Sequence, residues 1–408
     1  MRLAASLVVL SLAFYASARS HHFAAAHHIR RDMPMPDVSG YSVQPNSLGD
    51  ADNGYAGFPN VSNAQTILNF PLKSAEGATI PMYISAGKDN KNITRAVIVP
   101  PGKLRDNWYY FWVMDKALYQ AAETYEDVDY NAISIMAPAL LNPKDITAGA
   151  GDNTTLIFNG TTWMSGHYSS GPGSFTNISS YDVVDDLLDY YLDKDEFPNL
   201  DKVVIAGHSA GAQFGQRYAA LRKSSKHNAR IAFWLANPGS LLWLTADRPL
   251  PNSTCENVDR WKYGLTDGLP GYGTYAYNHY GRDGIVERYN SHNIHYAWGT
   301  ADDGPGDTRC QAKTQGLTHY ERGLNFVNMI KDISGGSVPD NATVDWVEGV
   351  SHDGEGMTRS EAGMTRLFRN ATYQRRFGND NGASASWEPA HGLLLGAAAA
   401  LVSALCVL

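Results

Sequence analysis

The sequence predicts an α/β fold, in which a mostly parallel central sheet carries helices on both of its faces. Two observations lead to this prediction. Seven short runs rich in β-branched residues are apolar at successive positions instead of alternating ones, which is typical of strands covered on both faces. Longer segments with one apolar face separate several of these runs, and a regular alternation of strand and helix favours parallel pairing.

The predicted elements are spread along most of the chain. Strands are expected at residues 80–85, 95–100, 131–140, 202–207, 230–239, 293–299 and 343–349, and helices at 108–125, 179–197, 210–223 and 314–333. Ser179 or Ser180 is an expected N-cap of the second helix. Because open parallel sheets place their chemistry beyond the carboxyl ends of the strands, the residues just after each strand are the candidates for a site.

The N-terminus has the pattern of a secretory signal. A charged Arg2, an apolar run and the small residues Ala16-Ser17-Ala18 predict removal of residues 1–18. The alternative, an uncleaved anchor helix, needs a longer apolar run. An extended lead-in is expected over 19–65, and Arg30-Arg31 within it is either a dibasic processing site or solvated surface.

The C-terminus predicts a glycosylphosphatidylinositol anchor. Small residues and a polar spacer over 377–391 are followed by an apolar tail over 392–408 that reaches the last residue. Asn381 begins the best small triplet and is the expected attachment residue, with Gly382 and Ser384 as alternatives. A membrane helix is the rival interpretation, but the tail is short and no basic flank follows it.

Cysteines and glycosylation motifs agree with export. Cys406 lies in the tail that anchoring would remove, so Cys255 and Cys310 remain as an expected disulfide pair. N-glycosylation is predicted at eight Asn-x-Ser/Thr motifs, namely Asn60, Asn92, Asn153, Asn159, Asn177, Asn252, Asn341 and Asn370.

Composition limits the classes of partner. The 408 residues carry a net charge of −8 and no long basic run, which gives nucleic-acid binding no support. With 43% hydrophobic residues, no internal repeat and no long linker, the chain has enough apolar material for one large core. We therefore expect one catalytic domain over 66–376.

The run Val203-Val204-Ile205-Ala206 leads into Gly207-His208-Ser209-Ala210-Gly211 and then a predicted helix. Chance alone gives a bare G-x-S-x-G match in about one chain in four of this composition, so the strand-turn-helix context matters more than the pattern. On these residues the chain resembles the α/β-hydrolase superfamily. With its predicted secretion signal, glycans and lipid tail, it is similar to a cell-surface, esterase-like serine hydrolase of a fungus or similar walled eukaryote.

The resemblance implies the chain order nucleophile, acid, histidine. Ser209 is then the nucleophile, Asp302 in the turn after strand 293–299 is the acid, and His352 just past strand 343–349 is the base. Asp303 and Asp307 are the alternative acids. The chemistry needs three groups because a serine hydroxyl attacks only when an imidazole takes its proton, and a carboxylate must orient and stabilise that imidazole.

The resemblance also implies an oxyanion hole. The backbone N–H of Ala210 is one expected donor, and the other is expected from the loop Val99–Asn107. Many relatives have His-Gly where this chain has Pro101-Gly102, so Lys103 is our choice for the second donor and Leu104 the alternative. The long loops 141–178 and 240–280 are expected to line or cover the site, and His208 is interpreted as structural.

The function expected from this reasoning is hydrolysis of a carboxylic ester of unknown identity through an acyl-enzyme, at the outer face of the plasma membrane or in the cell wall. No cofactor or metal is expected, because the sequence contains no HExxH, CxxC or phosphate-loop motif. Two alternatives stay open: a peptidase or a polyester or cell-wall acyl esterase with the same triad, and a non-catalytic surface interaction protein. The oligomeric state is not predicted.

Overall fold

The computed structural model describes residues 41–369. Several expectations fall outside this range: the signal at 1–18, the Arg30-Arg31 site, the glycan at Asn370, attachment at Asn381, and the segments 377–391 and 392–408. Within residues 41–369, no helix is both long enough and apolar enough to cross a membrane.

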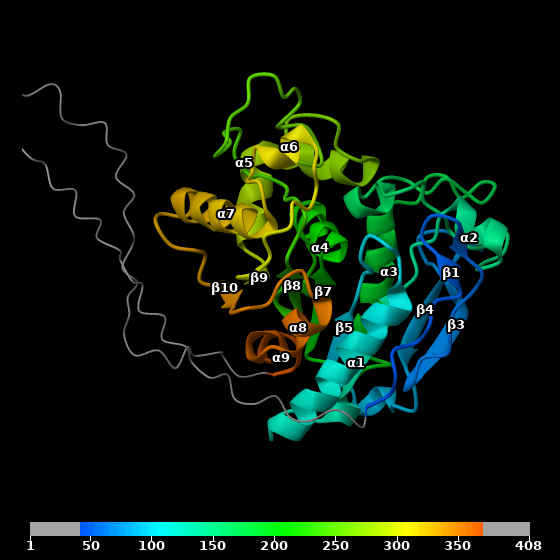
Figure 1. The fold of residues 1–408 in the computed structure, drawn as a ribbon. Helices are drawn as coiled ribbons and strands as arrows, with labels where there is room; N and C mark the ends of the chain where they lie inside the picture. The colour runs from blue at the N-terminus through cyan, green and yellow to red at the C-terminus, as the bar shows by residue number, and fades with distance from the viewer. Residues whose placement is uncertain (1–40, 370–408) are drawn as a thin grey trace, which may run out of the picture. The chain divides into compact units, whose positions relative to one another are not determined.

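An eight-stranded sheet forms the centre of the protein, with the strand order β10-β9-β8-β7-β5-β6-β4-β3 (Figure 1). Pairs among β5 to β10 are parallel, whereas β3 and β4 at one edge are antiparallel. The strands are β3 Ala64–Pro71, β4 Thr79–Ser85, β5 Arg95–Ile98, β6 Ile133–Pro138, β7 Lys202–His208, β8 Ile231–Ala236, β9 Asn293–Gly299 and β10 Ala342–Val347. A separate pair joins β1 Gly49–Asp50 to β2 Gly54–Tyr55.

Helices cover both faces of the sheet. On β7, Val203 and Ile205 belong to one apolar cluster, and Val204 and Ala206 to the other, because successive side chains of a strand point to opposite faces. Helices α3, α4, α5 and α7 pack in the first cluster, and α1, α8 and α9 in the second. The helices are α1 Asn107–Thr124, α2 Pro143–Ala148, α3 Ser180–Leu192, α4 Ala210–Leu221, α5 Gly271–Asn290, α6 Cys310–Lys313, α7 His319–Ile333, α8 Gly354–Arg359 and α9 Glu361–Phe368. The predicted mostly parallel sheet with helices on both faces is confirmed.

All seven predicted strands are present, whereas β3, α5 and α9, each of eight or more residues, were not predicted. Strand β3 was missed because it lies at the sheet edge and all of its residues are exposed or half-buried. The first half of helix α5 falls within the segment 240–280 that we expected to be loop. The folded body also starts earlier than residue 66, since Tyr55 and Val61 are buried and β3 already begins at Ala64.

Three local predictions can be compared with the structure. Ser179 is the N-cap of α3, and its hydroxyl accepts from the backbone N–H of Tyr181. Cys255 and Cys310 form a disulfide that joins the loop after β8 to α6, which follows β9. Six of the seven described glycosylation motifs have an exposed asparagine, whereas the seventh, Asn341, is half-buried and donates from Nδ2 to the carbonyl oxygen of His292 at 2.8 Å.

Candidate active site

A sharp turn between β7 and α4 presents Ser209. Its backbone has φ 56° and ψ −115°, which is a strained conformation for a residue with a side chain. Glycines on both sides make the turn possible. A Cβ on Gly207 would lie 2.2 Å from the backbone carbon and oxygen of Gly211, and a Cβ on Gly211 would lie 2.7 Å from the Pro100 carbonyl oxygen. The strand, turn and helix therefore approach too closely for any larger residue at these two positions.

The structure brings the three predicted side chains together at the carboxyl ends of their strands. Ser209 Oγ lies 2.9 Å from His352 Nε2, and His352 Nδ1 lies 2.7 Å from Asp302 Oδ2. Because an ionised carboxylate only accepts, Nδ1 of a neutral His352 carries the hydrogen and Nε2 has a free lone pair. That tautomer can accept the proton of the Ser209 hydroxyl.

Asp302 is fully buried, and its charge depends on its two donors. Burial alone raises the pKa of its carboxyl, but hydrogen bonds and charge interactions with His319 and His352 outweigh burial and lower the pKa to about 2. Asp302 is therefore ionised at neutral pH. Of the alternative acids, Asp303 is exposed and Asp307 accepts from Tyr263 and Arg309.

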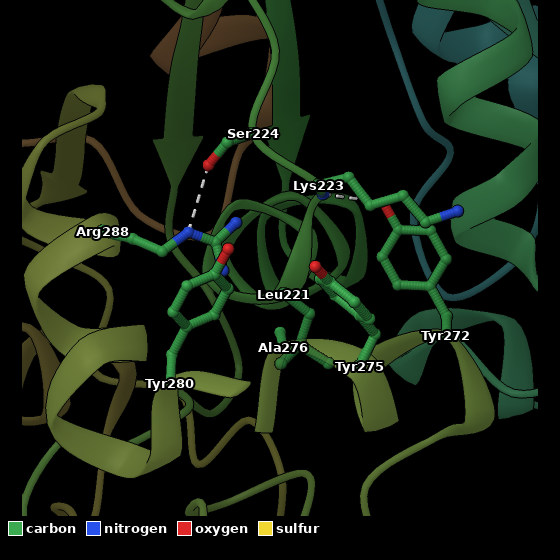
Figure 2. A pocket seen from close by; sticks show the side chains of 8 residues that line it. All are labelled: Leu221, Lys223, Ser224, Tyr272, Tyr275, Ala276, Tyr280 and Arg288. Atoms are coloured by element: carbon green, nitrogen blue, oxygen red, sulfur yellow. Dashed lines mark hydrogen bonds between the residues drawn. The ribbon is translucent and has the colours of Figure 1, made fainter. Parts of the chain in front are cut away.

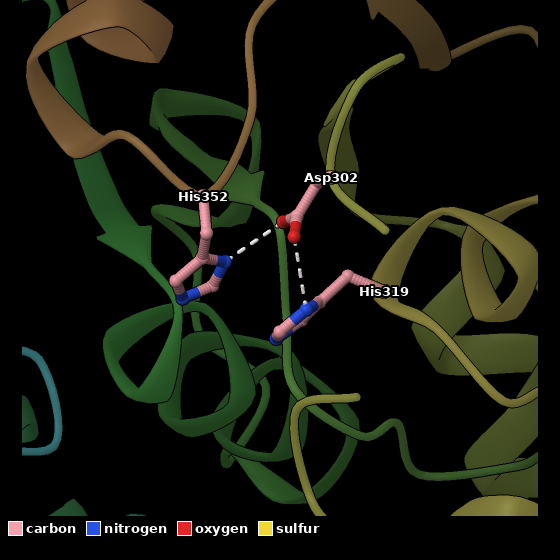
Figure 3. Close-up of side chains that lie close together, drawn as sticks. All are labelled: Asp302, His319 and His352. Carbon is pink, nitrogen blue, oxygen red and sulfur yellow. Dashed lines mark hydrogen bonds and ion pairs between the residues drawn. The ribbon is translucent and has the colours of Figure 1, made fainter. Parts of the chain in front are cut away.

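Two further histidines flank His352, and sequence reasoning assigned no functional role to either. His319 Nδ1 lies 3.1 Å from Asp302 Oδ1, and its ring stacks on that of His352 with centroids 4.1 Å apart (Figure 3). The His208 ring lies 4.7 Å from the His352 ring, and its Nδ1 is 3.2 Å from the Tyr110 hydroxyl. Burial, together with the nearby His352, lowers the pKa of His208 to about 3, so this ring is uncharged.

Asp302, His319 and His352 also form a set of residue types that can ligate a metal. The distances favour hydrogen bonding instead. Two ligands on one tetrahedral zinc ion lie about 3.3 Å apart, because each is about 2.0 to 2.1 Å from the metal. Asp302 Oδ2 and His352 Nδ1 are closer than that, at 2.7 Å, and an ion between them would have to displace the hydrogen that they share.

The surroundings of Ser209 suit a developing negative charge. Ala210 is the first residue of α4, and the first N–H groups of a helix have no partner within the helix. The loop after β5 lies against this end of α4, since the carbonyl oxygens of Pro100 and Pro101 are close to Gly211. The loop expected from sequence to supply the second oxyanion donor therefore borders the nucleophile turn. Lys103 and Leu104 follow in this loop and are exposed.

Comparison with solved structures identifies the fold, whereas comparison of sequences finds no relative. No protein-family model matches the chain, and no curated protein sequence is similar to it. Among solved structures, poly(aspartic acid) hydrolase-1 from Sphingomonas sp. KT-1 is similar with a TM-score of 0.50 and 17% identity, over 76% of this chain and 99% of that chain. The chain has the α/β-hydrolase fold.

Two other solved structures are similar at lower scores. LpqC, a poly(3-hydroxybutyrate) depolymerase from Bordetella parapertussis, has a TM-score of 0.48 and 19% identity, over 76% of this chain and 95% of that chain. The siderophore hydrolase EstB from Aspergillus nidulans has a TM-score of 0.41 and 12% identity, over 76% of this chain and 95% of that chain. Since an α/β-hydrolase fold hosts many activities, function has to be argued from the site.

The two long loops of this α/β-hydrolase fold meet each other beside α4. Trp261 Nε1 donates to the Ser165 carbonyl oxygen at 2.9 Å, and the buried Arg217 of α4 donates to the carbonyl oxygens of Met164 and Lys262. Trp163, which sequence reasoning considered for the lining, is fully buried against Phe214 of α4. It therefore anchors its loop to α4.

A cavity of about 350 Å³ lies at the other end of α4 (Figure 2). Tyrosines of α5, together with Lys223 and Arg288, surround it, and Leu221 contributes from the last turn of α4. Leu221 is twelve residues beyond Ser209, which corresponds to about 18 Å along a helix. This cavity is therefore separate from the candidate active site of the α/β-hydrolase fold.

Proposed function

We propose that this protein is a serine hydrolase that cleaves carboxylic esters through an acyl-enzyme. The observation that carries the proposal is the hydrogen-bonded chain from Asp302 through His352 to Ser209, in the tautomer that a general base requires. A non-catalytic protein with this fold has no need for a serine, a histidine and an aspartate within hydrogen-bonding distance of one another. The strained φ of Ser209 adds support, because strain of this kind persists at functional sites.

The proposed reaction has two halves. Ser209 Oγ attacks the ester carbonyl carbon while His352 Nε2 takes the hydroxyl proton, and Asp302 stabilises the imidazolium that forms. The N–H groups of Ala210 and Lys103 stabilise the oxyanion. The carbonyl re-forms as the C–O bond to the alcohol breaks, and His352 gives its proton to that alcohol. Water then attacks the acyl-enzyme by the same route, and the acid is released.

Ester cleavage is preferred to amide cleavage because an alkoxide leaving group depends less on protonation than an amine does. A peptidase, a polyester esterase or a cell-wall acyl esterase would use the same three residues. The solved structures described above are named as hydrolases of poly(aspartic acid), poly(3-hydroxybutyrate) and siderophores, which are different substrates on a shared fold. They leave the substrate of this chain open.

Covalent labelling tests the proposal. A fluorophosphonate probe should label the wild-type protein, and Ser209→Ala should abolish both labelling and turnover of a p-nitrophenyl ester. Ser224→Ala is the matched control, because this exposed serine lies near the other end of α4 and should behave as wild type. A folded wild-type protein that takes no label would contradict the proposal. Parallel assays on an ester and the corresponding anilide compare ester with amide cleavage.

We also propose that the enzyme is secreted and held at the cell surface by a lipid anchor. The support is sequence alone, namely the apolar run before residue 18 and the small-residue, spacer and tail pattern after residue 376. A phosphatidylinositol-specific phospholipase should release the protein from intact cells. Retention in the membrane after the lipid has been cleaved would favour a tail helix instead.

A further inference from the structure

The carboxylate of Asp302 has two imidazole neighbours, one at each oxygen. His352 Nδ1 donates to Oδ2 at 2.7 Å, and His319 Nδ1 faces Oδ1 at 3.1 Å. Figure 3 shows both rings directed at the same carboxylate from different segments, one from the turn after β10 and one from the start of α7. We propose that His319 is a positioning residue of the triad, which holds Asp302 through its second oxygen and covers one face of His352. This inference rests on the proposed function.

The contacts of His319 assign its hydrogen. Its Nδ1 lies 3.0 Å from the Gly304 carbonyl oxygen as well as 3.1 Å from Asp302 Oδ1. Because a carbonyl oxygen can only accept, Nδ1 carries a hydrogen that is directed at Gly304, and Asp302 Oδ1 has no hydrogen-bond partner of its own. His319 therefore places a polarised N–H group beside Oδ1 of the buried carboxylate, as a close electrostatic contact.

The backbone around His319 ties the acid turn to α7. The N–H of His319 donates to the Gly304 carbonyl oxygen at 3.0 Å, and the N–H of Tyr320 donates to the Asp302 carbonyl oxygen at 3.1 Å. Thr318 caps the helix by accepting from the Glu321 N–H at 3.1 Å. The first turn of α7 is thus fixed relative to the carboxylate. The His319 imidazole therefore lies beside Oδ1 on a helix turn whose backbone is held in place.

Loss of His319 would remove the imidazole N–H group that lies 3.1 Å from Oδ1 and leave space beside the buried carboxylate of Asp302. The carboxylate would then be free to rotate about its side-chain bonds toward another donor, because a buried acceptor without a partner is costly. Rotation would also move Oδ2 away from His352 Nδ1. The imidazole that must face Ser209 would lose its fixed orientation.

The stacking geometry gives a second way to position His352. The His319 ring stacks on the His352 ring at 26° with centroids 4.1 Å apart, and the tilted His208 ring lies 4.7 Å from His352 at 42°. A tilt of the His352 ring out of its plane would bring it into contact with the stacked His319 ring. The site therefore restrains His352 by packing as well as by its bond to Asp302.

Three substitutions of His319 test the effect of its Nδ1–H group and the effect of its ring separately. His319→Asn keeps an N–H donor at the place of Nδ1 but removes the ring, His319→Phe keeps a ring but removes the donor, and His319→Ala removes both. Because an N–H group beside a buried carboxylate stabilises its charge and its orientation, kcat on a p-nitrophenyl ester should fall about ten- to hundredfold in the Phe and Ala variants, with KM within about threefold of wild type. His319→Asn should recover most of the lost kcat, to within about fivefold of wild type.

A matched control accounts for the loss of a histidine that packs in the sheet but lies outside the site. His295 is half-buried near the amino end of β9, where its Nδ1 lies 3.0 Å from Thr343 Oγ1, whereas the site lies at the carboxyl ends of the strands. His295→Asn and His295→Phe should leave kcat within about twofold of wild type, even where they lower the melting temperature. Proton NMR gives a second measurement, since the downfield resonance of His352 Nδ1–H should broaden or shift upfield in His319→Phe and persist in His319→Asn.

The outcomes distinguish the two proposals. If the wild-type protein neither reacts with a fluorophosphonate nor turns over esters, the proposed function fails. If it does both, and folded His319→Phe and His319→Ala keep wild-type kcat and the downfield resonance, only the role of His319 is refuted. Equal losses of kcat in the Asn and Phe variants would also refute it, because they would indicate general damage to the fold at this position.

Discussion

Replacement of Asp302 by asparagine exchanges one of its two acceptor oxygens for a donor NH₂ group. His352 Nδ1 donates to one oxygen at 2.7 Å, and His319 Nδ1 lies 3.1 Å from the other. The NH₂ group of an asparagine must therefore face one of these two ring nitrogens. When the NH₂ group faces His352, the imidazole turns to the tautomer with its hydrogen on Nε2, which cannot accept a proton from Ser209.

The size of the effect follows from this choice of tautomer. Loss of the acid in a serine triad with its geometry otherwise intact costs about 10⁴-fold in kcat, which corresponds to about 5.4 kcal/mol of transition-state stabilisation. A smaller loss of kcat, of about 10³-fold, is expected if the asparagine oxygen faces His352 and its NH₂ group faces His319. Steady-state kinetics with a p-nitrophenyl ester measures the change, and circular dichroism checks the fold.

Asp303→Asn is the matched control, because this neighbouring carboxylate is exposed. It should keep kcat within about threefold of wild type. The reasoning is refuted if Asp303→Asn abolishes turnover while Asp302→Asn retains it, or if a folded Asp302→Asn variant is as active as wild type.

Two further predictions concern stability. Gly207→Ala should prevent the protein from folding with an intact nucleophile turn, because the new Cβ would lie 2.2 Å from the Gly211 backbone; a soluble variant with normal labelling and melting temperature would contradict this. The pKa of Asp302 is lowered from 3.8 to about 2 on folding, so its ionised form stabilises the protein above pH 4, and this contribution is lost as the pH falls toward 2. This lowering of the pKa is worth about 2 kcal/mol, so the free energy of unfolding in urea should fall less between pH 5 and pH 2.5 in Asp302→Asn than in wild type, and equal losses would refute the assignment.

Much of the fold could be predicted from sequence because the parallel strands are continuous apolar runs. Strand β3 lacks this signal, since it pairs on one side only and none of its eight residues is buried. Helix α5 has glycine at four of its twenty positions, and Gly281 breaks the helical backbone with φ 60°. Its helical state depends on buried contacts of residues such as Tyr272 and Tyr289 with the core, which are tertiary and leave no periodic pattern in so polar a segment.

The candidate site also contains residues that could be predicted from sequence and one, His319, that could not. Ser209, Asp302 and His352 could be proposed from sequence because each directly follows a recognisable strand, in an order that a known fold uses. His319 has no such signal, since the predicted helix 314–333 placed it inside a helix. Thr318 and Glu321 are a capping pair, and their spacing would have moved the start of the helix to His319, next to the turn that contains Asp302.

The environment of His352 depends on four segments that are distant in sequence. His208 comes from the end of β7, Asp302 from the turn after β9, His319 from the start of α7, and His352 itself from the turn after β10. Each ring is restrained by a different partner, since Tyr110 holds His208 and Gly304 holds His319. The ionised Asp302 accepts from His352, and the uncharged His208 adds no opposing positive charge, so this arrangement would stabilise an imidazolium formed at His352. A chain order of serine, acid and histidine can be found in sequence, but this balance of charge arises only where the four segments converge.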